Sequence, residues 1–450
     1  MQEVFLQNYD PAGNIWLSAA AAALPIAVFL LCLTVFKLKG YVAAFLTVAA
    51  SLAVAIIFYK MPAVTAFMSF AYGFFYGLWP IAWIILCAIF LYKLSVKSGY
   101  FETLKASITA ISPDCRIQVI LIAFSFGSFL EGAIGFGAPV AICAALLMGL
   151  GLKPLSAAGL SMIANTAGAA FGAVGIPVTA LSGTVNVDAQ LISTMTARML
   201  PPITFTLPFL LVFLVSGFRG VLGVLPHVIT AAASYTIAQY ATAKFLGPEL
   251  VNIIAAIVSI VMLWAALRIW KIKDVFRVSG QSEAKEGASL SAKDAFKAWL
   301  PFILIIAAIV VWNSSGFKSL VDFATFKFEV ANLHNLTASN SPISQGVQAI
   351  SAVYTWDALR ATGTAILLAA ILTTLILKIK PQIAVASAKE AAKEMAFPIV
   401  TIGFIVAYAY VAKYSGQAAT MGLALSSTGN AFGFFSPVIG WLGVFLTGSV

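Results

Sequence analysis

The sequence predicts an all-α, multi-pass transmembrane helical bundle of about 11–12 spans, with broken or re-entrant helices. The first observation behind this prediction is composition: 61% of the 450 residues are hydrophobic and 9% are charged, whereas soluble domains carry about a quarter charged residues. The second is that the apolar residues form blocks of about 18–25 residues, the length at which a helix crosses a bilayer. The third is that these blocks lack the alternation of polar and apolar residues typical of barrel strands.

The apolar blocks give the expected spans in chain order. They fall at residues 14–36, 41–59, 64–92, 117–151, 155–180, 199–217, 222–243, 250–269, 299–313, 361–378, 395–412 and 431–450. The block at 117–151 is too long for one span, so we expect it to be divided. Gly73, Gly77 and Pro80 predict a kink within the block at 64–92.

Basic residues gather in short segments between the blocks, and these orient the spans. Segments 37–39, 93–105, 268–297 and 378–393 hold most of them and are expected to face the cytoplasm. The N-terminus and residues 313–354 would then lie outside. The net charge of +10 is divided among these segments, so no continuous basic face forms and we expect no nucleic-acid partner.

A mixed-charge segment at 271–297 divides the chain. We expect residues 1–270 to form a first membrane repeat with a Gly-rich hairpin, 271–297 a cytoplasmic linker, and 298–450 a second membrane repeat. The four cysteines, Cys32, Cys87, Cys115 and Cys143, lack paired spacing and are expected to be packing residues. No metal or cofactor is expected.

The stretch FSFGSFLEGAIGFGAP, residues 124–139, places an acid, Glu131, among apolar residues, glycines and a closing proline. A carboxylate at membrane depth is costly unless it is protonated, paired or hydrated, and four glycines disfavour a continuous helix. We therefore predict a broken or re-entrant hairpin in which Glu131 carries a proton. The neighbouring Gly132, Gly135, Phe136 and Gly137 would bind substrate. The alternative is a tight helix-packing face with Glu131 in a structural hydrogen bond.

A second interrupted stretch, IANTAGAAFGAVGIP, covers residues 163–177. Asn165 and Thr166 are polar positions in an apolar block, and glycines and a proline follow. Interrupted helices expose N–H groups that favour an anionic headgroup, so a carboxylate substrate fits such a site and Asn165 and Thr166 are candidate substrate ligands. Small-residue packing, with Asn165 bonding across helices, is the alternative.

Enzyme classes find little support in the sequence. The chain has two histidines and no phosphate loop, zinc-ligand spacing or nucleophile triad. Secondary transport of a small carboxylate is therefore the leading hypothesis, and we expect the protein not to be an enzyme.

The chain closely resembles the bacterial L-lactate permease family of proton-linked carriers of lactate and glycolate. The resemblance runs over essentially the whole chain, through strings such as NYDPAGNIW, YGFFYGLWPIAWII, FLEGAIGFGAPVAI, WDALRATGTAIL and FFSPVIGWLGVFLTGS. It implies proton-coupled uptake of L-lactate or a related monocarboxylate across the bacterial plasma (inner) membrane, with the lipid bilayer as surroundings. The family looks like a branch of a larger ion-transporter superfamily with inverted repeats and midplane hairpins. Glu131, Asn165 and Thr166 fall in motifs that the family shares.

Members of that family continue past FLTGS with further spans, whereas this chain stops at Val450 inside an apolar block. We therefore expect a C-terminally truncated second repeat. The alternative to an active carrier is then a truncated, inactive permease fragment.

Overall fold

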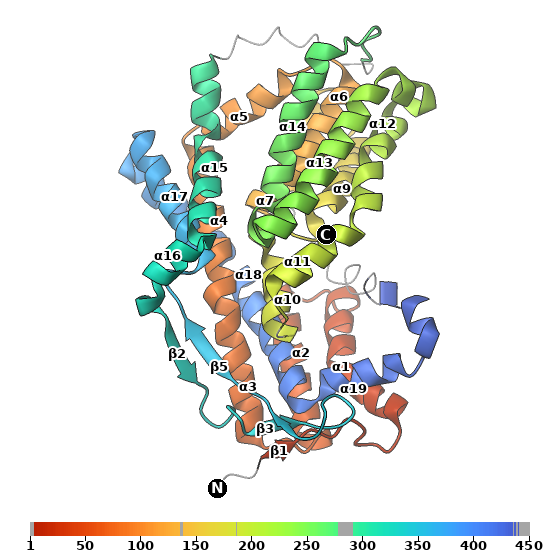
Figure 1. Ribbon diagram of the computed structural model, residues 1–450, viewed down its shortest axis with the longest axis vertical. Coiled ribbons are helices and arrows are strands. Elements are labelled where there is room, and N and C mark those ends of the chain that lie inside the picture. Colours follow the sequence, from red (N-terminus) through yellow and green to blue (C-terminus); the bar gives the residue numbers. More distant parts are fainter. Residues whose placement is uncertain are drawn as a thin grey trace. The chain divides into compact units, whose positions relative to one another are not determined.

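A computed structural model describes residues 4–135, 138–185, 187–277, 291–434, 436–437 and 440 (Figure 1). In this part of the chain nine helical segments are long and apolar enough to cross a membrane, and helices Pro139–Gly149 and Thr362–Ile376 are apolar but shorter. The nine are Ile15–Thr34, Gly40–Phe58, Ala63–Lys97, Cys115–Ala133, Pro154–Val185, Pro201–Gly223, Pro248–Ile269, Lys293–Asn313 and Pro381–Ser415. The predicted all-α, multi-pass helical bundle is confirmed.

The chain forms two compact units that are interleaved along the sequence. The first unit comprises the described residues of Met1–Leu86, Ser319–Ala361 and Ala392–Ser449, and the second those of Cys87–Lys318 and Thr362–Ala391. Two helices, α4 (Trp83–Lys97) and α18 (Pro381–Ser415), contribute to both units. Residues 278–290 of the predicted linker lie outside the described residues, and the repeat boundaries stay a prediction.

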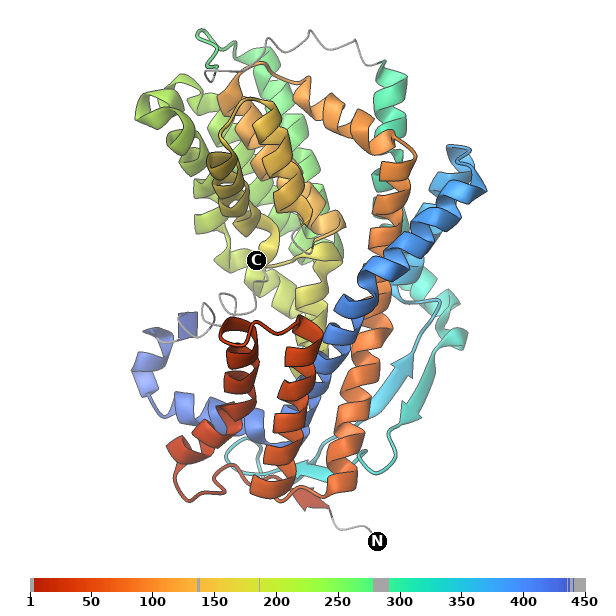
Figure 2. The same cartoon turned by 180° about the vertical axis from the view of Figure 1, so that it is seen from behind.

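The first unit is built on tightly packed N-terminal helices and the second half of α18. Its helical elements are α1 (Ile15–Thr34), α2 (Gly40–Ala53), η1 (Val54–Phe58), α3 (Ala63–Tyr76), η2 (Gly77–Ala82) and α19 (Gln417–Ser426). Figure 2 shows α1 and α2 as neighbouring red helices. A methyl carbon added at Gly73 would lie 2.7 Å from Cα of Ala407, so only glycine allows α3 to approach α18 this closely.

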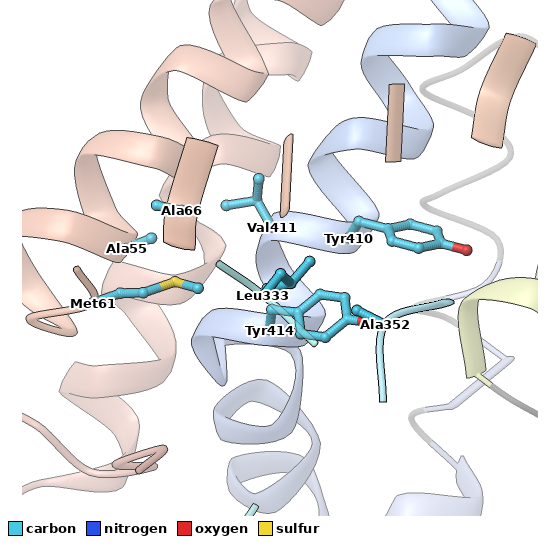
Figure 3. Packing of buried hydrophobic residues seen from close by; sticks show 8 residues of the cluster. All are labelled: Ala55, Met61, Ala66, Leu333, Ala352, Tyr410, Val411 and Tyr414. Carbon is cyan, nitrogen blue, oxygen red and sulfur yellow. The ribbon is translucent and has the colours of Figure 1, made fainter. Parts of the chain in front are cut away.

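An apolar cluster in the first unit joins helices to the segment between α16 (Ser315–Leu320) and α17 (Thr362–Ile376). Its buried members are Ala55, Met61, Ala66, Leu333, Ala352, Tyr410, Val411 and Tyr414 (Figure 3). Tyr414 donates its hydroxyl hydrogen bond to the carbonyl of Ser351 at 2.9 Å. A tyrosine buried with its hydroxyl paired adds apolar area without an unpaired polar group.

Short strands occur in the two segments predicted to lie outside, the N-terminus and residues 313–354. β1 (Phe5–Leu6), β3 (Thr337–Ser339) and β4 (Gln348–Ala349) form one sheet in the order β1-β3-β4, and β2 (Phe326–Glu329) pairs antiparallel with β5 (Val353–Trp356). β1 and β3 are parallel although they come from distant parts of the chain. Runs of two to four residues are too short to show an alternating pattern, so the sequence does not predict these strands.

The predicted kink in the third apolar block is present. The helical segment Ala63–Lys97 contains the π-helical turn η2, in which Trp79 has φ −135° and ψ 120°. Gly77 packs on Cα of Gly403, and Pro80 removes a backbone donor. A helix that loses this donor beside a close helix contact bends there.

The second unit surrounds one fully buried helical rod. The rod is α6 (Cys115–Val119), η3 (Ile120–Phe126) and α7 (Gly127–Ala133), and every residue in it is buried. Around it in sequence order are α5 (Tyr100–Thr109), α8 (Ala138–Gly149), α9 (Pro154–Ala169), η4 (Ala173–Gly175), α10 (Ile176–Val185), α11 (Ala189–Met199), α12 (Pro201–Gly223), α13 (Leu225–Phe245), η5 (Pro248–Leu250), α14 (Val251–Ile269), α15 (Ala292–Asn313), α16 (Ser315–Leu320) and α17 (Thr362–Ile376).

A buried ion pair anchors the start of this rod. Arg116 donates to both carboxylate oxygens of Asp114, at 3.0 and 2.7 Å, and to the carbonyl of Asp274 at 2.7 Å. Asp114 also accepts from the backbone N–H groups of Arg116 and Phe276. The segment after α14 is thereby tied to the first turn of α6. A bidentate pair whose remaining polar atoms are hydrogen-bonded is the form in which buried charges are tolerated.

Candidate functional site

Both Gly-rich stretches interrupt helices, as predicted, and the two interruptions touch. The rod ends at Ala133 and α8 begins at Ala138, while α9 ends at Ala169 and α10 begins at Ile176. A methyl carbon added at Gly135 would lie 2.9 Å from Cβ of Ala173. The two breaks therefore meet at one place in the second unit, in the region where α7, α9 and α14 lie side by side (Figure 1).

The second break depends on backbone conformations that glycine adopts without strain. Gly172 and Gly175 have φ of +54° and +69°. A methyl carbon at Gly175 would lie 2.6 Å from the carbonyl carbon of Pro248, in η5. Val174 between them has φ 48° and is buried; a β-branched residue in this region is strained and is held there by its surroundings.

Two buried side-chain amides donate hydrogen bonds to backbone carbonyls at the end of α9. Asn252, in the first turn of α14, donates to the carbonyls of Gly168 at 2.8 Å and Gly172 at 3.1 Å. Gln239 of α13 donates to the carbonyl of Ala167 at 3.1 Å. The carbonyl of Gly168 also accepts from the backbone N–H groups of Phe171 and Gly172. The side-chain amides supply further donors at a helix end, where carbonyls lack part of their intrahelical hydrogen bonds.

Glu131 lies in this region on α7, with 3% of its surface exposed. Its side chain packs on α9, where a methyl carbon at Gly168 would lie 3.2 Å from Cγ of Glu131. Asn165, one turn earlier on α9, is a hydrogen-bond partner of the Glu131 carboxyl. Oε2 of Glu131 has no hydrogen-bond partner among the described residues. A buried acid beside an interrupted helix is therefore present where the sequence predicted one.

The structure brings together some of the predicted site residues and separates another. Gly132 packs on α14, since a methyl carbon there would lie 2.7 Å from Cβ of Asn252. Gly135 is in the first break, and Asn165 is buried beside Glu131. Thr166 is exposed on a different face of α9. The predicted ligands Phe136 and Gly137 lie outside the described residues.

Sequence reasoning did not single out Asn252 and Gln239. Both are amides within predominantly apolar helices, and both are buried. A polar side chain in an apolar membrane helix usually finds an interhelical partner, and that signal could have identified both positions. All four cysteines are buried and free, as expected of packing residues. Across the described residues no group of three or more His, Cys, Asp and Glu is arranged to hold a metal ion.

The family follows from comparison with known proteins. The family model described as L-lactate permease matches residues 18–450. This chain belongs to the L-lactate permease family. It is 47% identical to the L-lactate permease of Escherichia coli (strain K12), over 98% of this chain and 82% of the relative. It is 43% identical to the L-lactate permease of Bacillus subtilis (strain 168), over 98% and 83%. The glycolate permease GlcA of E. coli (strain K12) is 42% identical, over 98% and 82%.

No solved structure matches the chain significantly. The L-lactate permease family consists of transporters, so the prediction that the chain is not an enzyme is confirmed. With its apolar helices, this member of the family is a multi-pass protein of the bacterial plasma membrane.

Proposed function

We propose that this protein is a secondary active transporter that takes up L-lactate, and related short 2-hydroxycarboxylates such as glycolate, together with protons. The names of the relatives, L-lactate permease and glycolate permease, support the substrate class. The observation behind the coupling is a buried acid, Glu131, beside two helix breaks that touch each other. We take the lipid bilayer to be the solvent of the apolar helices.

Glu131 is the proposed proton carrier. A carboxylate inside a membrane helix is costly unless it is paired with a cation or neutralised by a proton. The ion pairs found among the described residues join other acids to lysine, arginine or histidine, and none involves Glu131. Its described partner is an amide, Asn165. Protonation is then the simplest way to neutralise this side chain during each transport cycle.

The two helix breaks are the proposed site for the carboxylate of the substrate. α8 begins at Ala138 and α10 at Ile176, each directly after a break. The first N–H groups of a helix lack intrahelical acceptors, and the helix dipole favours an anion there. Gly132, Gly135, Phe136, Gly137, Asn165 and Thr166 remain the proposed substrate set.

An inactive fragment is the alternative, and the comparisons do not favour it. Relatives named as permeases match over 98% of this chain, although the chain covers 82% of the length of the E. coli relative.

Uptake by the purified protein in liposomes tests the proposal. We expect labelled L-lactate to accumulate when the outside is acidic, and a protonophore to abolish that accumulation. Unlabelled L-lactate and glycolate should compete, whereas propionate, which lacks the 2-hydroxyl, should compete weakly. Accumulation of L-lactate that does not depend on the proton gradient would contradict proton coupling. Competition by propionate equal to that by L-lactate would contradict the preference for 2-hydroxycarboxylates.

A further inference from the structure

Asn252 lies between the acid-bearing helix and the interrupted helix. Its Cβ contacts α7 at Gly132, the residue after Glu131, and its Nδ2 lies 3.3 Å from the position of a methyl carbon at Gly168. Cγ of Glu131 lies 3.2 Å from that same position. The side-chain stem of Glu131 and the Asn252 amide therefore both pack on one glycine, and Asn252 is itself only 2% exposed.

The hydrogen bonds fix which end of the Asn252 amide is available. An amide nitrogen has two N–H donors, and those of Asn252 are directed to the carbonyls of Gly168 and Gly172. Its Oδ1 then remains, and this oxygen can only accept. Oδ1 of Asn252 and Oε2 of Glu131 are both buried without a partner among the described residues. A buried acceptor that lacks a donor is unfavourable, and these two side chains pack on the same glycine.

One proton resolves this conflict. A protonated carboxyl becomes a donor, whereas an ionised carboxyl can only accept. We propose that Asn252 is the positioning residue that links protonation of Glu131 to the conformation of the α9 break: its Oδ1 accepts from the protonated acid while its N–H groups hold Gly168 and Gly172. This inference rests on the proposed proton-carrying role of Glu131.

Loss of the proton then has a structural consequence. An ionised Glu131 seeks donors, and the nearest amide donors on α14 are those already bonded to the break. If the amide turns toward the carboxylate, the carbonyl of Gly172 loses its described donor and that of Gly168 keeps only the backbone N–H groups of Phe171 and Gly172, so the break must rearrange. Proton release and movement of the interrupted helix are coupled through a single side chain.

Among the described residues, few other titratable groups face Glu131. The neutral phenol of Tyr235, on α13, lies near the Glu131 carboxyl. On the elements packed against α7, Cys143 lies on α8 and Arg268 in the last turn of α14, while α9, η3 and η4 carry no titratable side chain. Glu249 in η5 belongs to the segment that packs on the second break. If substitution of Asn252 changes the pH dependence of L-lactate uptake while these other groups are unchanged, we assign that change to Glu131.

Two substitutions at this position separate the proposed role from a purely structural one. Asn252→Ala removes the acceptor and should move the pH midpoint of L-lactate uptake down by about half to one unit, because the protonated acid loses its partner. Asn252→Asp adds a carboxyl that shares a proton with Glu131, and should move the midpoint up by a similar amount. Asn252→Ser keeps an acceptor but has one donor in place of two; it should move the midpoint less than Asn252→Ala and serves if either variant inserts poorly.

Gln239→Ala is the matched control, because it removes the same kind of amide bond to a carbonyl of α9. Gln239→Ala should lower the rate of L-lactate uptake per inserted protein and leave the pH midpoint of uptake unchanged. Asn252 variants that lower the rate without moving the midpoint would overturn the inference. The same holds if they lose only the preference for L-lactate over propionate, since Oδ1 would then serve the substrate hydroxyl. Glu131→Gln is measured in parallel: if it retains normal pH dependence, the proposed function itself fails.

Discussion

Glu131 and Gly168 are packed side by side, so that a methyl carbon on Gly168 would lie 3.2 Å from Cγ of the acid. The same methyl carbon would lie 3.3 Å from Nδ2 of Asn252. The acid on α7, the break after α9 and the amide on α14 therefore share one contact. The space that glycine leaves open at this position is what allows the three to meet.

Gly168→Ala should impair transport without preventing membrane insertion. Overpacking of about 1–3 kcal/mol would displace Glu131 or Asn252, which both pack on Gly168, and we expect uptake per inserted protein to fall by roughly tenfold. Gly159→Ala is the control, because it lies on the same helix and a methyl carbon there meets nothing within 4 Å. Equal loss in both variants, measured as initial L-lactate uptake, would contradict the packing argument.

Gly175→Ala should destabilise the protein more than Gly217→Ala. The two glycines have similar φ, +69° and +67°, but a methyl carbon meets the backbone of Pro248 at 2.6 Å in the first case and nothing in the second. Gly217→Ala therefore reports backbone strain of about 1–3 kcal/mol. Gly175→Ala adds steric overlap of a similar size. Thermal unfolding of the detergent-purified variants measures both losses of stability. Equal shifts in Tm would show that η5 is displaced without a cost in stability.

Arg116→Leu should be strongly destabilising, by about 3–5 kcal/mol, because it leaves Asp114 buried without its cation. Adding Asp114→Asn to Arg116→Leu should recover part of the loss. Lys105→Gln is the control, since the Glu102–Lys105 pair is solvent-accessible and such pairs contribute little. The Tm of each of the three variants measures these effects. If the double variant is less stable than Arg116→Leu, the buried charge of Asp114 is not the cause of the destabilisation.

Ionisation of Asp357 is expected to make the stability of the first unit depend on pH. Burial raises the pKa of the Asp357 carboxyl above its usual value, although the indole N–H of Trp79 donates to it and lowers the pKa in part. A raised folded-state pKa gives stability that is present below the unfolded pKa and is lost as pH rises through the folded pKa.

Asp357→Asn keeps an acceptor oxygen for Trp79 and removes the charge. Its Tm should therefore match wild type at acidic pH, where Asp357 is protonated in both states, and exceed it increasingly toward neutral pH. A Tm difference that is the same at every pH would show that the ionisation of Asp357 does not contribute.

Local composition was enough to predict the parts of the site that depend on the chain's own conformation. Glu131 in an apolar block and the glycines around it predict a buried acid and a broken helix, and the glycine–proline pattern near Trp79 predicts a kink. These features depend on the cost of a buried charge and on backbone freedom, which neighbouring residues determine.

Contacts between distant segments could not be predicted in the same way. Nothing beside Asn252 in the sequence indicates that its amide reaches Gly168 and Gly172. The adjacent residues Asn165 and Thr166 looked equivalent, yet about 100° of helix rotation separates them, and only Asn165 lies beside Glu131. The strands from 326 to 356 pair through long-range contacts that have no local pattern.

Glu131→Gln tests the central claim most directly, through two assays on the same liposomes. Uptake of labelled L-lactate driven by an inward proton gradient tests coupling, and exchange of labelled for unlabelled L-lactate at equal pH tests binding and movement. We predict that the variant loses gradient-driven accumulation and keeps measurable exchange, because glutamine preserves the shape of the side chain and cannot release a proton. Undiminished, pH-dependent accumulation by Glu131→Gln would contradict the role of Glu131.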